Sequence, residues 1–156
     1  MTQGSPEKEI WSAWAKLLDR DLKKLHEEIA AFKSEENVWK TIGSIINPAG
    51  TLCLHLTGSL NHFVGNTMGN TGFVRDREGE FANRNIPRET MLRDLDACRE
   101  MVVKTLNAQP EGTLTATFPR KFMEQDVTYA WFLSHILTHV SYHLGQVNYL
   151  RRALEG

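Results

Sequence analysis

The stretch HVSYHLGQ, residues 139–146, places two histidines four positions apart inside a long amphipathic pattern. On an α-helix this spacing separates two side chains by about 6 Å along the axis and about 40° around it. Both imidazoles can therefore reach one metal ion, as the histidines of HExxH helices do. The pair falls on the apolar face, where each unpaired ring nitrogen costs about 1 to 3 kcal/mol. A divalent cation held by His139 and His143 would remove this penalty.

A third histidine, His55, is predicted on the inward side of another helix, beside Leu52 and Leu56. Three protein ligands are typical of catalytic zinc sites, because they leave a coordination position for water or substrate. Gly58 and Ser59 follow about one helical turn later, and we expect their small side chains to leave space for such a molecule. The sequence thus predicts a metal site with an open position.

Two further histidines are alternatives to these ligands. His135 and His139 form another four-residue pair, but His135 cannot share an ion with His143 because eight residues span about 12 Å of helix axis. His62 follows His55 by seven residues on nearly the same line, so only one of the two can lie level with the pair. We prefer His55 because its neighbours are more apolar. A metal-free core containing histidines is the remaining alternative.

Composition limits the classes of function. With 156 residues, 41% hydrophobic and 24% charged, the chain is expected to form a single soluble domain, residues 1–156. The net charge of -1 and the scattered basic residues argue against a nucleic-acid partner. Cys53 and Cys98 form no CxxC pair and are predicted to be buried thiols in a reducing compartment. Without a signal-peptide pattern or an apolar run of about 18 residues, we expect a cytoplasmic protein with no membrane partner.

Apolar periodicity predicts four amphipathic helices. They are expected from Ser5-Pro6-Glu7 to about Phe32, from Asn47-Pro48 to the Gly- and Asn-rich residues 68–72, from near Pro87 to residues 109–112, and from about Glu124 to Leu154. The inward face of the third helix is expected to carry Leu92, Leu95, Val102 and Leu106. We predict an all-α four-helix bundle, with a long crossover between helices 2 and 3 over residues 69–88. Residues 113–118, TLTATF, alternate like half of a minor β-hairpin before helix 4.

These residues resemble the DinB-like superfamily, the YfiT-type metal-dependent four-helix bundles, over almost the whole chain. The resemblance is carried by NPAGTLCLHLTGSLNHFVG, by RDREGEF and by HILTHVSYHLGQVNYLRR. In that family one histidine of the second helix and an HxxxH of the last helix hold the metal, which places the ligands at His55, His139 and His143. The resemblance implies zinc or nickel and a homodimer, and a face carrying Trp11 and Trp14 would also suit a dimer.

The resemblance also implies a reaction, because better understood members of the superfamily look like transferases and isomerases that use glutathione, mycothiol or bacillithiol. Three neutral imidazoles leave the ion its full charge, which favours deprotonation of a thiol or a water molecule. We therefore expect a metal-dependent enzyme, a thiol S-transferase or isomerase acting on a small electrophile, or a hydrolase. The alternative is a non-catalytic, stress-related bundle that binds a metal or a small ligand.

Four residues are candidates for contact with a small-molecule substrate. Arg75 and Arg77, with Glu80, are expected to form a rim over the site, where the arginines receive a substrate carboxylate; the alternative is a solvated, salt-bridged loop. Gln146 is expected to donate to a ligand or to orient His143. Tyr142 is expected to line the pocket or an interface, and ordinary packing is the alternative.

Overall fold

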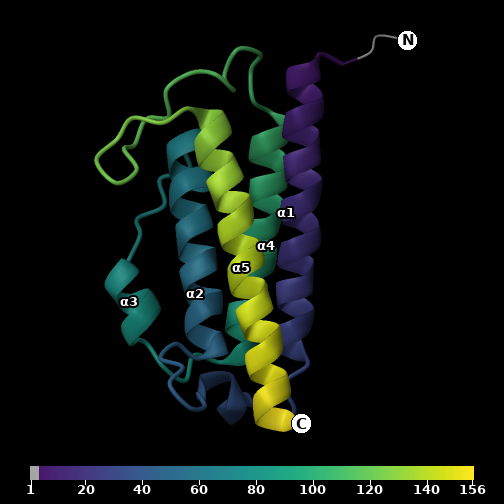
Figure 1. Ribbon diagram of the computed structural model, residues 1–156, viewed down its shortest axis with the longest axis vertical. Coiled ribbons are helices and arrows are strands. Elements are labelled where there is room, and N and C mark those ends of the chain that lie inside the picture. The colour runs from purple at the N-terminus through teal and green to yellow at the C-terminus, as the bar shows by residue number, and fades with distance from the viewer. Residues whose placement is uncertain (1–3) are drawn as a thin grey trace.

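The computed structural model describes residues 4–156, and its regular structure is helical, as the sequence predicts. The elements are α1 (Pro6–Ala30), the 3-10 helix η1 (Glu35–Trp39), α2 (Ala49–Leu60), the π-helix η2 (Asn61–Met68), α3 (Arg77–Ala82), α4 (Arg88–Asn107) and α5 (Tyr129–Glu155). The long helices α1, α2, α4 and α5 lie side by side, and the short α3 lies outside α2 (Figure 1). Within the described residues, no helix combines the length and apolar character required to cross a membrane.

Helix α1 begins where the sequence predicts. The Lys8 backbone N–H donates to the Ser5 hydroxyl at 3.4 Å, and Pro6 occupies the first turn, where its missing N–H leaves no bond unmade. The apolar stripe of α1 is buried at Trp11, Leu18, Leu22, Leu25, Ile29 and Phe32 and half-buried at Trp14. Trp11 therefore belongs to the core of one chain and not, as the sequence suggested, to an exposed dimer face. The stripe attaches α1 mainly to α4 and α5.

Helix α2 lies deepest in the fold, and nearly all of its residues are buried. Its backbone turns helical after Pro48, close to the predicted start, and it runs directly into η2, so the second predicted helix is found as two consecutive segments. The position of α2 between α4 and α5 brings His55 to the inside of the molecule.

Helix α4 spans almost the predicted range, and most of its predicted inward face is buried. Leu95, Val102 and Leu106 are buried as predicted, whereas Leu92 is half-buried against the core and Met91 is buried instead. Residues 91, 95, 98 and 102 follow one another at steps of four, three and four, so position 92 lies about 100° away from that line.

The segment before α5 differs from its prediction. The hairpin is not confirmed: over residues 4–156 there is no strand, only isolated antiparallel bridges joining Thr117 to Thr128 and Phe122 to Gln125. Met123 and Glu124 have φ angles of 48° and 64°, which are incompatible with a right-handed helix. The last helix therefore starts at Tyr129, later than the predicted Glu124.

The predicted crossover contains a short helix that sequence periodicity did not indicate. The Gly79 backbone N–H donates to the Asp76 carboxylate at 2.9 Å, which caps the first turn of α3. A six-residue helix has too few turns to show a period, but Asp76 is the type of residue that commonly caps one. This cap brings Glu80 against α2.

Candidate metal centre

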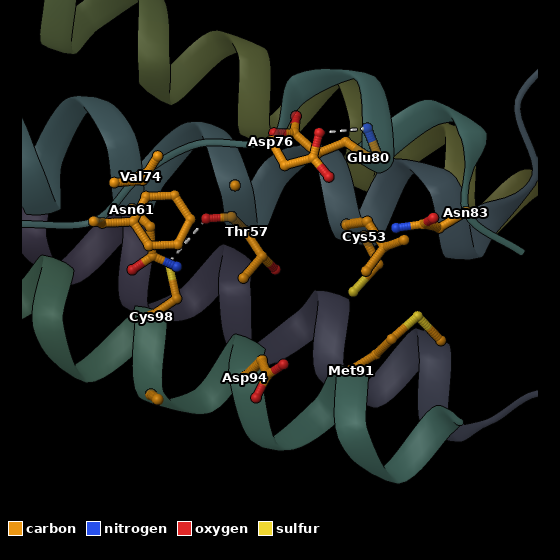
Figure 2. Close-up of a pocket in the computed structure, with 15 residues that line it drawn as sticks. Cys53, Thr57, Asn61, Val74, Asp76, Glu80, Asn83, Met91, Asp94 and Cys98 are labelled. Atoms are coloured by element: carbon orange, nitrogen blue, oxygen red, sulfur yellow. Dashed lines mark hydrogen bonds between the residues drawn. The ribbon is translucent and has the colours of Figure 1, made fainter. Parts of the chain in front are cut away.

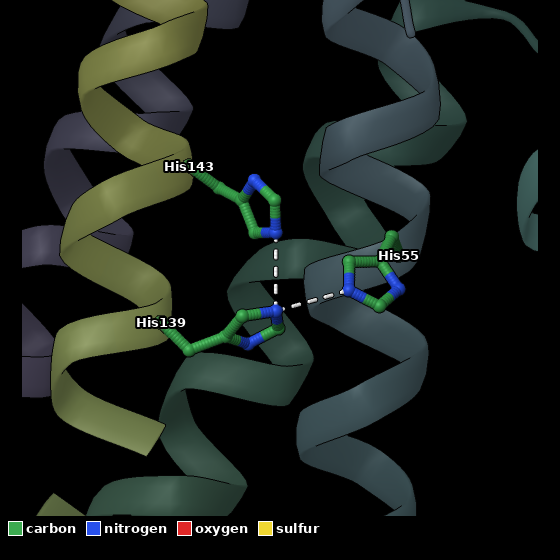
Figure 3. A group of neighbouring side chains, drawn as sticks. All are labelled: His55, His139 and His143. Carbon is green, nitrogen blue, oxygen red and sulfur yellow. Dashed lines mark hydrogen bonds between the residues drawn. The ribbon is translucent and has the colours of Figure 1, made fainter. Parts of the chain in front are cut away.

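Three imidazoles from two helices meet between α2 and α5, as Figure 3 shows. The Nε2 atom of His139 lies 3.2 Å from Nε2 of His55 and 3.0 Å from Nε2 of His143. One ligand atom of each residue lies within 4.8 Å of the others, close enough to bind a single metal ion. The structure thus brings together the three histidines predicted from the sequence.

The outer nitrogens of two of these rings have fixed partners. His55 Nδ1 donates to the Glu80 carboxylate at 3.1 Å, and His143 Nδ1 donates to Gln146 Oε1 at 2.6 Å. A neutral imidazole with a proton on Nδ1 carries a lone pair on Nε2. His139 can satisfy only one of those two lone pairs with its own proton. A cation satisfies all three nitrogens at once, so the donor set fits a divalent metal.

The surroundings of His55 and His139 favour the neutral imidazole, which is the form that binds metal. Burial lowers the pKa of His55, although the hydrogen bond to Glu80 opposes the shift. Burial, followed by the nearby His143 and His55, lowers the pKa of His139 to about 4. At neutral pH His139 therefore offers a lone pair rather than a charge.

The Glu80 carboxylate is held from two sides. Arg75 donates to it through Nε and Nη2, each at 2.7 Å, while His55 donates to Oε1. Glu80 is buried, with 7% of its side chain exposed, and the bidentate arginine balances its charge. Arg75 is therefore salt-bridged, as in the alternative expectation, but with 12% of its side chain exposed the ion pair is buried rather than solvated.

Gly58 lines an open pocket, but this pocket includes none of the three histidines, and the space next to the Gly58 Cα is taken by Glu80. A Cβ atom at this position would overlap the Glu80 carboxylate. The absence of a side chain on α2 therefore allows α3 to bring Glu80 within hydrogen-bonding distance of His55. The sequence analysis did not predict the hydrogen bond between His55 and Glu80. The feature that could have indicated it is Gly58, which follows His55 by three residues on the same face of the helix.

The other predicted contact residues lie around the triad at different distances. Gln146 orients His143, one of the two roles expected for it. Tyr142 is 65% exposed, with its ring centroid 5.5 Å from that of His143. Arg77 is exposed and lies over the Phe81 ring, 5.3 Å from its centroid, where it has no described contact with the triad.

Neither alternative histidine belongs to the described cluster. His135 stacks on both His139 and Trp131, with centroids 5.8 and 5.6 Å away. His62 packs against Phe63 in η2. His55 was therefore the better choice on α2, and the pair at 139 and 143 was the better choice on α5.

A pocket of about 430 Å³ lies between α2, α3 and α4, on the face shown in Figure 2. Cys53, Cys98 and Glu80 line it, whereas none of the three histidines does. Burial raises the pKa of both thiols to about 12. They are therefore protonated at neutral pH and are poor nucleophiles.

A second pocket, of about 570 Å³, reaches the triad itself. His143 and Gln146 line one part of it, and the loop before α2 lines another. A small molecule in this pocket would lie beside a candidate metal ligand.

The family model for proteins of unknown function designated DUF1572 matches residues 9–156. The chain belongs to this family. A comparison with curated proteins found no match. In this DUF1572 chain, the three histidines and their partners Glu80 and Gln146 all lie inside the matched region.

Proposed function

We propose that this DUF1572 chain is a metal-dependent enzyme of the DinB-like superfamily with that superfamily's four-helix bundle fold. It would hold zinc or nickel at His55, His139 and His143 and act on a small electrophile as a thiol S-transferase or isomerase. We further propose that the protein is a cytoplasmic homodimer and that it uses a low-molecular-weight thiol. It would have no nucleic-acid or membrane partner.

The observation that carries the proposal is the convergence of three Nε2 atoms while Glu80 and Gln146 occupy the outer nitrogens of two rings. When bound, the ion would supply Lewis acidity that favours deprotonation of a thiol or a water molecule. Three ligands from the protein leave room for a further one, as in catalytic sites.

The chain's own residues would contribute orientation and charge balance. Glu80 holds the His55 ring and is itself neutralised by Arg75, so this part of the site carries no net charge. Gln146 holds the His143 ring without adding charge. The exchangeable proton of each ring would remain on Nδ1, away from the ion and the substrate.

Elemental analysis of untagged protein tests the metal site. We expect about one zinc or nickel ion per chain, and its loss in His143→Ala with unchanged helical circular dichroism. His26→Ala is the control, because His26 contacts Asp96 outside the triad. A metal-free wild-type protein that gains no ion after incubation with zinc or nickel would contradict the proposal.

Thiol consumption distinguishes an enzyme from the alternative, a non-catalytic bundle that binds a metal or a small ligand. Metal-loaded protein is incubated with glutathione, mycothiol or bacillithiol and a panel of small electrophiles. Loss of free thiol reports a transferase, and thiol-dependent conversion of an electrophile to its isomer reports an isomerase, which regenerates the thiol. Turnover of either kind that disappears in His139→Ala supports the enzyme. A loaded protein that consumes no thiol, isomerises no electrophile and hydrolyses none of a parallel ester and amide panel supports the binding protein.

A further inference from the structure

The pocket beside His143 has a lining whose chemistry restricts what it can bind. Apolar side chains form most of its wall, from the loop before α2, from α2 and from the last turns of α5: Ile45, Ile46, Leu52, Tyr149, Leu150 and Ala153. At about 570 Å³, its size is that of a typical small-molecule site. Its polar groups include His143 and Gln146, so one part of the pocket adjoins the candidate metal centre.

The lining carries no fixed charge. Among the described residues that form the pocket, none is Asp, Glu, Lys or Arg. A carboxylate or ammonium group held against the apolar wall, away from the proposed ion, would lose hydration without gaining an ionic partner, which is unfavourable. Arg75, the arginine hydrogen-bonded beside the triad, does not line this pocket and is already paired with Glu80.

Two apolar side chains of this pocket are strongly exposed to solvent. Ile46 is 85% exposed and Tyr149 is 76% exposed. An apolar ligand in the pocket would remove part of this surface from water, which favours its binding. The apolar wall and the polar end at His143 suit a molecule with an uncharged hydrophobic body and one polar reactive group.

We propose that this pocket is the substrate site, and that it selects an uncharged thiol or electrophile whose hydrophobic body lies against Ile46 and Tyr149 while its reactive group points to His143. The inference rests on the proposed function for the role of the metal. It departs from the expectation, drawn from the crossover arginines, that the substrate carries a carboxylate.

Three thiols that share one skeleton test this selectivity. 4-(Mercaptomethyl)benzoic acid and 4-(mercaptomethyl)benzamide are nearly equal in size and differ in charge, and benzyl mercaptan lacks the added group. Each is titrated into cobalt(II)-substituted protein, and affinity is measured from the change in the visible spectrum. With the sulfur directed to the ion, the para group lies against the apolar wall, so we expect the two neutral thiols to bind at least about tenfold more tightly than the carboxylate, which alone brings a charge there.

Two isoleucines of the same loop provide a matched pair of variants. Ile46 lines the pocket, whereas Ile42 is also exposed but does not line it. We expect Ile46→Ser to weaken benzyl mercaptan binding by about threefold to tenfold, because part of the apolar contact is lost. Ile42→Ser should leave the affinity unchanged, and both variants should bind cobalt as the wild type does.

The outcomes separate this inference from the proposed function. Cobalt binding with equal affinity for all three thiols, or with preference for the carboxylate, overturns the substrate class and leaves the metal site intact. If Ile46→Ser and Ile42→Ser change the affinity for benzyl mercaptan equally, this pocket is not the substrate site. If the wild type self-associates in sedimentation experiments and Ile46→Ser abolishes this association, the surface binds a second copy of the chain. That result also overturns the assignment of the pocket as a substrate site.

Failure to bind cobalt would contradict the proposed function instead. In that case the S-methyl thioethers of the same compounds are titrated into metal-free protein by calorimetry. Preference for the neutral thioether, lost in Ile46→Ser, would support the pocket without the metal. No preference would overturn it.

Discussion

Glu80 and Gln146 each accept a hydrogen bond from one ring of the triad, and we expect the substitution of Glu80 to have the larger effect on metal affinity. Glu80→Gln removes the charge that Arg75 neutralises and weakens the acceptor for His55 Nδ1. We expect metal affinity to fall by about 10- to 100-fold, as for other residues that orient a metal-binding histidine. Competition with a chromophoric chelator measures this affinity. Glu78→Gln, on the exposed side of α3, is the control, and an equal loss in both variants would contradict the role of Glu80.

Two helical glycines are expected to respond in opposite directions to the same substitution. Gly58→Ala places a Cβ against the Glu80 carboxylate, so it should lower both stability and metal affinity. Gly145→Ala meets no atom within 4 Å, so it should stabilise α5 by about 0.5 to 1 kcal/mol. Chemical denaturation and chelator competition measure the two effects. Similar stability changes in both variants would contradict the close approach of α3 to α2.

The two cysteines are expected to resist modification in the folded protein. Because burial raises the pKa of Cys53 and Cys98 to about 12, both remain thiols at pH 8, and only the thiolate reacts with a disulfide reagent. We expect little labelling by an aromatic disulfide at pH 8 and rapid labelling of both cysteines in denaturant. Rapid reaction of the native protein would show that one thiol is accessible and ionised.

Sequence spacing predicts the three candidate metal ligands because it reports which residues share a helical face. It does not report contacts between a helix and a loop. The attachment of Glu80 to His55 depends on the path of the crossover, which has no period. It also depends on Gly58, and a glycine at that position is equally compatible with an open space beside the ligand. The ion pair with Arg75 depends on the same path.

At the scale of elements, the start of α5 depends on a cap. The Trp131 backbone N–H donates to the Thr128 hydroxyl at 3.2 Å. Thr128→Ala is expected to lower the free energy of unfolding by about 1 kcal/mol, because an N–H of the first turn loses its acceptor. Ser134→Ala, at an exposed site within α5, should change it little. Urea denaturation compares the two, and an equal loss would place the helix start elsewhere.

The boundaries of α5 and α3 could not be read from apolar periodicity. The left-handed turn at Met123 and Glu124 involves no glycine or asparagine, the residues that usually mark such conformations. Helix α3 is shorter than two full turns of α-helix, and its one signal is the cap Asp76. By contrast, the long stripes of α1 and α4 repeat over many turns, so their existence and approximate ends were predictable.

At the scale of the whole molecule, a bound ion would link α2 to α5. His55 and His139 are 84 residues apart in sequence, so only the folded chain presents the ligands together. A metal present at about 100 times its dissociation constant should stabilise the fold by about 2.7 kcal/mol, which corresponds to a rise in Tm of about 5 to 10 °C. Calorimetry should show this rise in the wild type and in His26→Ala. A similar rise in His143→Ala would place the ion at another site.

The order of the ligands along the chain has a consequence for biogenesis. During translation, a ribosome that has released residues 1–107 has exposed α1, α2 and α4 but only one of the three imidazoles. At that stage the proposed site would lack two of its three ligands. Capture of the ion would then wait until the segment carrying residues 139–143 has docked, so metallation would act as a final check on correct assembly.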